Sequence, residues 1–348
     1  MPRMKNCLIV SWLIFIVFPF QLMASNWAWV EKPVKPVQWD ISYWPWFMTF
    51  DKNIGKLTLF MNDLDTGAVQ VWTFSGDTWT KAWEGIPDMG DLSRRYYFRY
   101  IFNIYFDDNV NRIVIWAGCP GYQFETWCDA LFKYEPGVGF IRITNCIEVD
   151  DYSTSFPPLT MTFDTARHRA VYVGAFRKFF ADIGMSRFVT IEYDGSNIYY
   201  IPNPGTPPYD EIYFENGTSG YDPVSGHVVF YGMQDSGCPL QTWEYDGNTW
   251  TQLATAISPQ ILDPIIGMIH VPGLGGLLAV PNEFGPINSW LYRGHQWVQL
   301  QVDAQFDSNI FAVMALDLTR NAIIFYDVYA NHMWELHCVG HCRPVIKP

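Results

Sequence analysis

Charged side chains are scarce in this chain of 348 residues, where Asp, Glu, Lys and Arg together make up only 16%. Long helices that face solvent need many such residues, so their scarcity disfavours a helical protein. Aromatic residues reach 18%, and they are accompanied by 26 glycines and 23 prolines. This composition predicts many short strands joined by turns.

Positive charge is especially scarce, because 22 Lys and Arg face 35 Asp and Glu, which gives a formal net charge of −13. A protein of this sign repels the phosphates of nucleic acids and of anionic lipid headgroups. We therefore expect neither nucleic acid nor an anionic membrane surface as a partner.

The familiar catalytic signatures are absent from the sequence. It contains no Gly-x-Ser-x-Gly elbow, no His-Glu-x-x-His pair and no phosphate-binding loop. The segment HCVGHC at residues 337–342 has metal-like spacing, but four ligands within six residues cannot easily surround one ion. We expect no metal and no cofactor.

The first 24 residues are predicted to be a signal peptide. Arg3 and Lys5 precede an apolar run from Cys7 to Phe20, which is followed by the small residues Ala24 and Ser25. A retained membrane anchor is the less favoured alternative, because the run is short and contains Pro19. The expected mature protein is a single domain, residues 25–348, without a membrane span, and is secreted, periplasmic or extracellular.

Six cysteines follow the predicted signal peptide: Cys119, Cys128, Cys146, Cys238, Cys338 and Cys342. An even number in an exported protein predicts disulfides. We expect Cys119 to pair with Cys128 across one loop and Cys338 with Cys342 in a short C-terminal tail. This leaves Cys146 for Cys238, although the sequence does not fix the connectivity. Asn216 begins the glycosylation signal Asn-Gly-Thr.

A recurring hairpin organises the chain. Its first strand ends in an aspartate followed by a tight turn and a hydrophobic strand, with copies at Asp51, Asp107, Asp164, Asp222 and Asp317, and Pro272 in a sixth copy. An aspartate fits here because its carboxylate accepts backbone N–H groups two or three residues later. A second hairpin follows at residues 71–83, 131–143, 190–202, 242–253 and 289–300.

Paired hairpins of this size predict an all-β, six-bladed β-propeller of four-stranded antiparallel blades. The sixth copy lacks its last strand, and NWAWVEK at residues 26–32 supplies the missing tryptophan, so we expect the N-terminal strand to close the ring. The alternative is closure by the C-terminal tail. The aspartate turn and the Trp-x-Tyr-Asp-Gly-x-x-Trp pattern of residues 243–250 resemble those of kelch-type β-propellers, a class that includes the central domain of the galactose oxidase family. The resemblance implies a divergent kelch-type β-propeller.

The ligand-binding face is predicted from loop length. Long connections, such as residues 84–102, 174–187 and 203–218, leave one side of the ring, whereas the turns on the other side are short. Candidate ligand-binding residues on the long-connection side are Arg94, Arg95, Arg99, Arg177, Arg187, Tyr122, Trp127, Trp44 and Trp46, joined by the carboxylates Asp150, Asp151, Asp182, Asp210, Glu211 and Glu215. Arginine beside aromatic rings suits an acidic sugar or a carboxylate-bearing peptide. The alternative is that these groups only pair with one another and pack the loops.

The resemblance to galactose oxidase does not extend to its copper chemistry, because His168, His227 and His295 fall at the short turns. We therefore predict an exported, non-catalytic recognition module that binds an extracellular or envelope protein or a glycan through the long-connection side. The alternative is a glycan-active hydrolase or lyase with an Arg/carboxylate site in the central pit of the same side.

Overall fold

The computed structural model places 26 strands, and among the residues that it describes there is no helix. The described residues are 27–33, 43–63, 65–88, 98, 100–120, 127–145, 147, 160–177, 186–201, 217–232, 240–255, 257–259, 265–281, 285–286, 289–300, 307–308, 312–328 and 330–338. The predicted signal peptide therefore lies outside the described residues.

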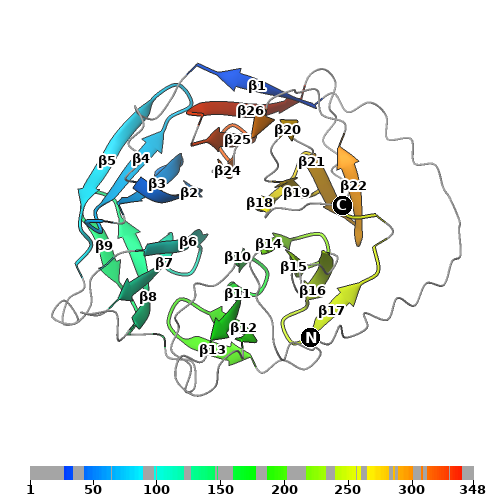
Figure 1. Ribbon diagram of the computed structural model, residues 1–348, viewed down its shortest axis with the longest axis horizontal. Helices are drawn as coiled ribbons and strands as arrows, with labels where there is room; N and C mark the ends of the chain where they lie inside the picture. The colour runs from blue at the N-terminus through cyan, green and yellow to red at the C-terminus, as the bar shows by residue number, and fades with distance from the viewer. Residues whose placement is uncertain are drawn as a thin grey trace, which may run out of the picture.

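Six four-stranded antiparallel sheets surround a common axis (Figure 1), which confirms the predicted six-bladed β-propeller. The first blade contains β2 (Tyr43–Asp51), β3 (Lys56–Asp63), β4 (Val69–Phe74) and β5 (Trp79–Gly85). The second contains β6 (Tyr100–Asp107), β7 (Arg112–Pro120), β8 (Trp127–Glu135) and β9 (Gly139–Arg142), and the third β10 (Thr160–Asp164), β11 (Arg169–Arg177), β12 (Ser186–Tyr193) and β13 (Ile198–Ile201). The fourth contains β14 (Gly217–Asp222), β15 (His227–Gly232), β16 (Gln241–Tyr245) and β17 (Trp250–Leu253).

The fifth blade contains β18 (Ile265–Val271), β19 (Gly276–Pro281), β21 (Ser289–Arg293) and β22 (Gln296–Leu300). A small two-stranded sheet of β20 (Gly285–Pro286) and β23 (Asp307–Ser308) accompanies it. Within each of the first five blades the strands follow one another from the axis outward, so hairpin after hairpin builds the blade (Figure 1).

The sixth blade combines the two ends of the described chain. Its order is β1-β26-β25-β24, with β24 (Ala312–Asp317), β25 (Ala322–Asp327) and β26 (His332–Cys338) from the C-terminal part and β1 (Trp27–Lys32) outermost. The register runs from Trp27 opposite Cys338 to Lys32 opposite Met333. Closure by the N-terminal strand is thereby confirmed, and the blue β1 lies beside the red β26 in Figure 1.

The aspartate turns form as the sequence predicts. The carboxylate of Asp164 accepts the amides of Ala166 and Arg167, each at 3.0 Å, and Asp107 and Asp317 accept the equivalent amides. Four residues after each aspartate the backbone is left-handed, at Gly55, Asn111, His168, Gly226 and Asn321. Glycine and asparagine tolerate this conformation best, which explains their recurrence at that position.

Neighbouring blades pack against each other through aromatic and aliphatic side chains. One buried cluster joins Leu59 and Phe74 of the first blade to Ile324 and Met333 of the sixth, and Trp79 packs against it. Trp250 and Trp297 are buried in two further clusters of this kind. The recurring tryptophans therefore hold neighbouring blades together, as their periodicity predicts.

Among the described residues, an indole hydrogen bond accompanies this packing at three junctions. The indole Nε1 of Trp250 donates to Thr190 Oγ1 and that of Trp297 to Thr242 Oγ1, each at 2.8 Å, and Trp29 Nε1 makes a longer bond of 3.4 Å to Ser289 Oγ. At the junction of the first and sixth blades the corresponding position holds Met333. The buried Nε1 of Trp79 there has no acceptor among the described residues.

Replacing Thr242 by valine is expected to lower the free energy of unfolding by about 1–3 kcal/mol, because the isosteric change leaves a buried indole N–H without an acceptor. Urea unfolding of the purified protein measures this. Thr58→Val is the matched control, since Thr58 is fully buried and its Oγ1 has no partner among the described residues. The control is expected to leave stability unchanged or to raise it, and equal losses in both variants would contradict the assignment.

Candidate functional site

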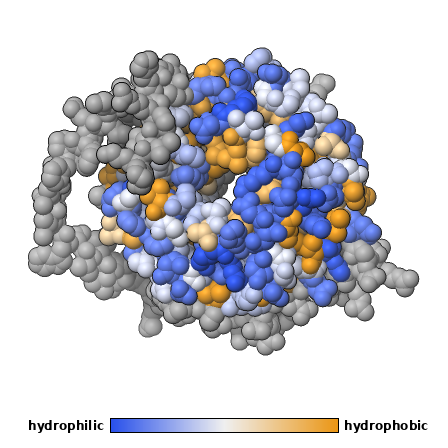
Figure 2. Space-filling model, turned by 180° about the vertical axis from the view of Figure 1, so that it is seen from behind, coloured by the Kyte–Doolittle hydropathy of each residue, from blue (hydrophilic) through white to orange (hydrophobic). Residues whose placement is uncertain are grey.

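A cavity of about 430 Å³ lies on the axis of the ring, walled by the innermost strands β2, β6, β10, β14, β18 and β24. Its wall uses the part of each strand that precedes the aspartate turn, for example residues 47–49 of β2, which ends at Asp51. In β6 and β10 the wall also includes Phe106 and Phe163, which directly precede the turns at Asp107 and Asp164, so the cavity extends along the axis between the two sides of the ring. In the space-filling view the middle of the molecule is hollowed, with hydrophobic and hydrophilic residues around the hollow (Figure 2).

Irregular pairing marks the mouth of this cavity. The register of three inner strands shifts near their first residues, between Tyr43 and Trp46, between Ile101 and Asn103, and between Ile265 and Gly267. Such bulges redirect side chains and are over-represented next to active sites. Asn103 and Gly267, which follow two of the shifts, line the cavity.

The start of β6 is fixed by the first blade. A Cβ atom at Gly67 would lie 2.1 Å from the carbonyl oxygen of Phe98, so only glycine allows this approach. Phe98 is almost fully buried, and its ring meets that of Phe132 edge-on at 5.3 Å. Asn62, also buried, accepts the amide of Ile101 at 3.3 Å. These contacts hold one wall of the cavity in place, and the sequence analysis did not identify them.

The described wall of the cavity contains no Asp, Glu, Lys, Arg or His. Tyr105 belongs to it, but its hydroxyl donates to Asp107 Oδ2 at 3.0 Å and lies 3.1 Å from that of Tyr172. Burial, with the nearby Tyr172 and Asp107, raises the pKa of Tyr105 well above its ordinary value, so the phenol stays neutral. His270 follows the wall residue Ile269. Burial lowers the pKa of His270, and this effect exceeds the opposite effect of the Asp222 charge, so the imidazole is neutral at pH 7.

Five of the predicted ligand-binding residues have a described backbone. Trp44 and Trp46 lie in β2, Trp127 begins β8, Arg177 ends β11, and Arg187 is the second residue of β12. All five lie at strand ends on the long-connection side. Arg177 is opposite Ser186, and Arg187 is opposite Phe176, one step away in the same ladder.

The other predicted site residues lie outside the described residues. They are Arg94, Arg95, Arg99 and Tyr122, the carboxylates Asp150, Asp151, Asp182, Asp210, Glu211 and Glu215, and Asn216. Their role as ligand-binding or glycosylated residues stays a prediction.

The cysteines are partly described. Cys119 lies directly opposite Cys128 in the β7–β8 ladder, and Cys338 is the last residue of β26. Cys146, Cys238 and Cys342 lie outside the described residues, so all three disulfides stay predictions. In the described part of the chain, no three His, Cys, Asp or Glu residues are grouped in a way that would hold a metal ion. No helix there is long and apolar enough to span a membrane.

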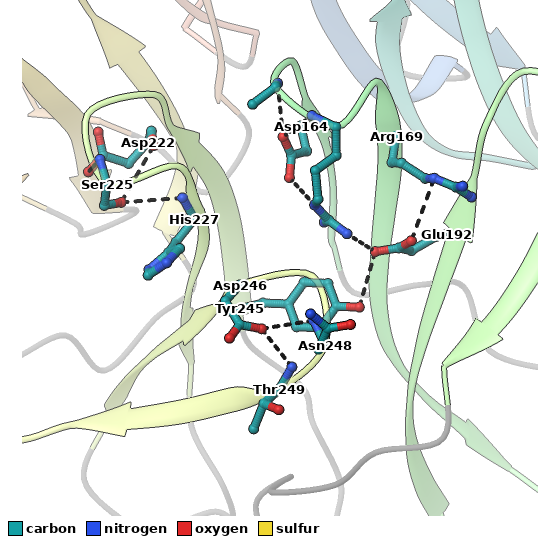
Figure 3. A network of polar contacts seen from close by, with 12 residues as sticks. Asp164, Arg169, Glu192, Asp222, Ser225, His227, Tyr245, Asp246, Asn248 and Thr249 are labelled. Carbon is teal, nitrogen blue, oxygen red and sulfur yellow. Dashed lines mark hydrogen bonds and ion pairs between the residues drawn. The ribbon is translucent and has the colours of Figure 1, made fainter.

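The short-turn side carries a separate network of buried charge (Figure 3). Glu192 Oε1 accepts Arg167 at 2.5 Å and the hydroxyl of Tyr245 from the next blade at 3.0 Å, while Arg167 also binds Asp164 at 2.6 Å. Its members bond to one another, and Asp164, Arg167, Glu192 and Tyr245 do not belong to the described cavity wall. We therefore assign it to holding the third and fourth blades together. The sequence analysis missed it, although the recurrence of Glu before Tyr in residues 192–193 and 244–245 is visible.

Glu244 occupies the equivalent position in the fourth blade. It accepts the hydroxyl of Tyr292 at 2.6 Å, and it lies 3.0 Å from His227 Nδ1 and 2.8 Å from His295 Nδ1. Burial would raise the pKa of Glu244, but the bonds from Tyr292, His227 and His295 lower it below its ordinary value. Both histidines are thus engaged on the short-turn side, as their sequence positions predict.

No known protein family matches the chain, and no curated protein matches its sequence. Solved structures do share its fold. An alpha-L-arabinanase from Penicillium chrysogenum is 8% identical with a TM-score of 0.61, and an alpha-L-arabinofuranosidase from Fusarium graminearum is 7% identical with a TM-score of 0.60. Each match covers 90% of this chain and 97% of the other. A Hadza microbial sialidase is 14% identical with a TM-score of 0.58, covering 85% of this chain and 66% of that one.

These similarities correct the functional prediction. The propellers named above are an arabinanase, an arabinofuranosidase and a sialidase, which speaks against the predicted non-catalytic recognition module and favours the alternative of a glycan-active hydrolase or lyase. The β-propeller itself is confirmed, whereas the resemblance to kelch and galactose oxidase propellers is not. The sequence could not decide between the two alternatives, because the carboxylates of a glycosidase can come from different loops and leave no local motif.

Proposed function

We propose that the protein is a glycan-active hydrolase whose site lies at the mouth of the axial cavity on the long-connection side. The observation that carries this is the cavity itself, about 430 Å³ in volume and bordered by three bulged strands. Small-molecule sites have volumes of about 300–1,000 Å³. The arabinanase, arabinofuranosidase and sialidase that share the fold support glycan hydrolysis as the reaction.

Most enzymes that hydrolyse a glycosidic bond use two carboxyl groups, one to protonate the leaving oxygen and one to act as base or nucleophile. The described cavity wall supplies neither. We assign both roles to the connections, which contain Asp150, Asp151, Asp182, Asp210, Glu211 and Glu215. In this proposal Arg94, Arg95, Arg99, Arg177 and Arg187 bind and orient the substrate, and Tyr122, Trp127, Trp44 and Trp46 stack on sugar rings.

A glycan panel tests the proposal. Purified protein is incubated with arabinan, galactan, xylan and sialylated oligosaccharides, and new reducing ends are measured. Hydrolysis of at least one substrate is expected, and replacing an essential carboxylate by its amide should lower kcat about 10²–10⁴-fold. A lyase would instead release an unsaturated sugar that absorbs ultraviolet light.

Two further variants connect activity with the cavity. A Cβ atom at Gly267 would meet only Met314 Cε, at 3.9 Å, so a side chain can start there, and Gly267→Leu is expected to narrow the cavity. We expect Gly267→Leu to raise KM, whereas Val224→Ser, at a 71% exposed position on the short-turn side, should have no effect. The proposal is wrong if no substrate is cleaved, or if each of the six carboxylate variants keeps full activity.

A further inference from the structure

The wall of the axial cavity indicates which kind of sugar unit enters it. Its polar side chains are all neutral, namely Thr49, Asn103, Tyr105, Thr160, Thr162, Thr218 and Ser219, and its other described residues are apolar or glycine. The innermost strand of each blade is also the edge of its sheet. Edge strands present unpaired backbone N–H and C=O groups, which are strong but uncharged donors and acceptors. The wall therefore suits hydroxyl groups.

The charged groups nearest to this wall are already occupied. Asp107 accepts the hydroxyl of Tyr105 and the amides of Asn109 and Val110, and Asp164 accepts Arg167 and two amides of its turn. Among the described residues, no cation faces the cavity to balance an anionic ligand. A carboxylate that leaves water without such a partner loses more hydration energy than neutral hydrogen bonds return.

One hydroxyl pair provides a specific contact. Thr160 of the third blade and Ser219 of the fourth both line the cavity, and their hydroxyl oxygens are 2.8 Å apart. The amide of Ser219 also donates to Thr160 Oγ1 at 2.8 Å. Two hydroxyls that share one hydrogen bond retain one further proton, which has no acceptor among the described residues. That proton is available to a sugar oxygen.

We propose that the axial cavity binds a neutral, hydroxyl-bearing sugar unit and rejects units that carry a carboxylate, such as uronic and sialic acids. This proposal deepens the proposed hydrolase function and rests on it. It departs from the sequence-based expectation of an acidic ligand, which relied on arginines of the connections. The described cavity wall contains none of those arginines.

Matched sugar pairs test the proposal by binding, independently of turnover. Galactose and galacturonate differ only in a hydroxymethyl group or a carboxylate at one carbon, as do glucose and glucuronate, and mannose and mannuronate. The affinity of each sugar for the wild-type protein is measured by ligand-observed NMR and calorimetry, together with short oligosaccharides that end in each unit. We expect at least one neutral member to bind ten or more times more tightly than its acid.

Variants locate the site. Ser219→Ala and Thr160→Val should each weaken binding of the neutral sugar about threefold to tenfold through loss of a hydrogen bond. Gly267→Lys introduces a cation into the open part of the wall and should raise the affinity for the acid at least tenfold. Val224→Ser is the surface control, and thermal unfolding identifies any variant that fails to fold.

The outcomes separate the two proposals. Acids that bind as tightly as their neutral partners, or a complete panel without binding, would overturn the neutral-sugar proposal. Hydrolysis of a sialylated or uronic substrate would leave the hydrolase function intact and refute only the neutral-sugar assignment. Binding of a neutral sugar that responds to Ser219→Ala, without hydrolysis of any glycan, would support the cavity assignment and remove the catalytic function.

Discussion

Replacement of Trp29 by alanine is expected to lower the free energy of unfolding by about 3–5 kcal/mol, the usual cost of removing a large buried aromatic side chain. Trp29 is 6% exposed and packs edge-on against Phe325 at 5.8 Å between ring centres. Its cluster joins residues of the fifth and sixth blades. Because β1 is the only described strand of the sixth blade that comes from the N-terminal part of the chain, the variant weakens the closure of the whole ring.

Urea unfolding followed by circular dichroism measures this loss. Glu31→Gln is the matched control on the same strand, because Glu31 is exposed and its contact of 2.9 Å with His332 is at the surface. Even when charged, an exposed contact of this kind contributes about 0–1 kcal/mol. Deleting residues 26–32 should be at least as damaging as Trp29→Ala. A stable, cooperatively unfolding deletion variant would show that the ring does not depend on β1.

Most of the fold was predictable because short-range sequence patterns specify it. The aspartates of the turns, the alternating strands and the recurring tryptophans each act within one hairpin or between adjacent ones, so they repeat visibly along the chain. Closure of the ring by the N-terminal strand was predictable because the sixth copy of the repeat lacks one strand, which residues 26–32 can supply. The structure confirms this in the register of Trp29 opposite Leu336.

The site was less predictable, because its parts are distant in sequence. The contact of Gly67 with Phe98 and the hydroxyl pair of Thr160 and Ser219 join different blades, and neither has a local signature. The uncharged wall is also invisible in the sequence, since it arises when six separate strands meet at the axis. The arginines of the connections led to the prediction of an acidic ligand, whereas the described cavity wall contains hydroxyl, amide and apolar groups.

The buried network between the third and fourth blades supports the second strong prediction. Glu192→Leu is expected to lower the free energy of unfolding by about 3–5 kcal/mol, as when one partner of a buried ion pair is removed. The side chain of Glu192 is only 6% exposed, and its loss leaves Asp164 as the one carboxylate bound to Arg167 among the described residues. The hydroxyl of Tyr245 would lose its acceptor as well.

Two variants distinguish loss of the network from loss of a charge in general. Glu84→Gln removes a carboxylate whose partner Lys81 lies 2.7 Å away, but both side chains are more than a third exposed, so the expected loss is about 0–1 kcal/mol. Glu192→Gln keeps an acceptor for Tyr245 and Arg167 and should retain part of the stability lost in Glu192→Leu. Equal losses in Glu192→Leu and Glu84→Gln would mean that the network does not hold the blades together. Because the network lies on the short-turn side, glycan binding by the folded fraction of Glu192→Leu should match that of the wild type.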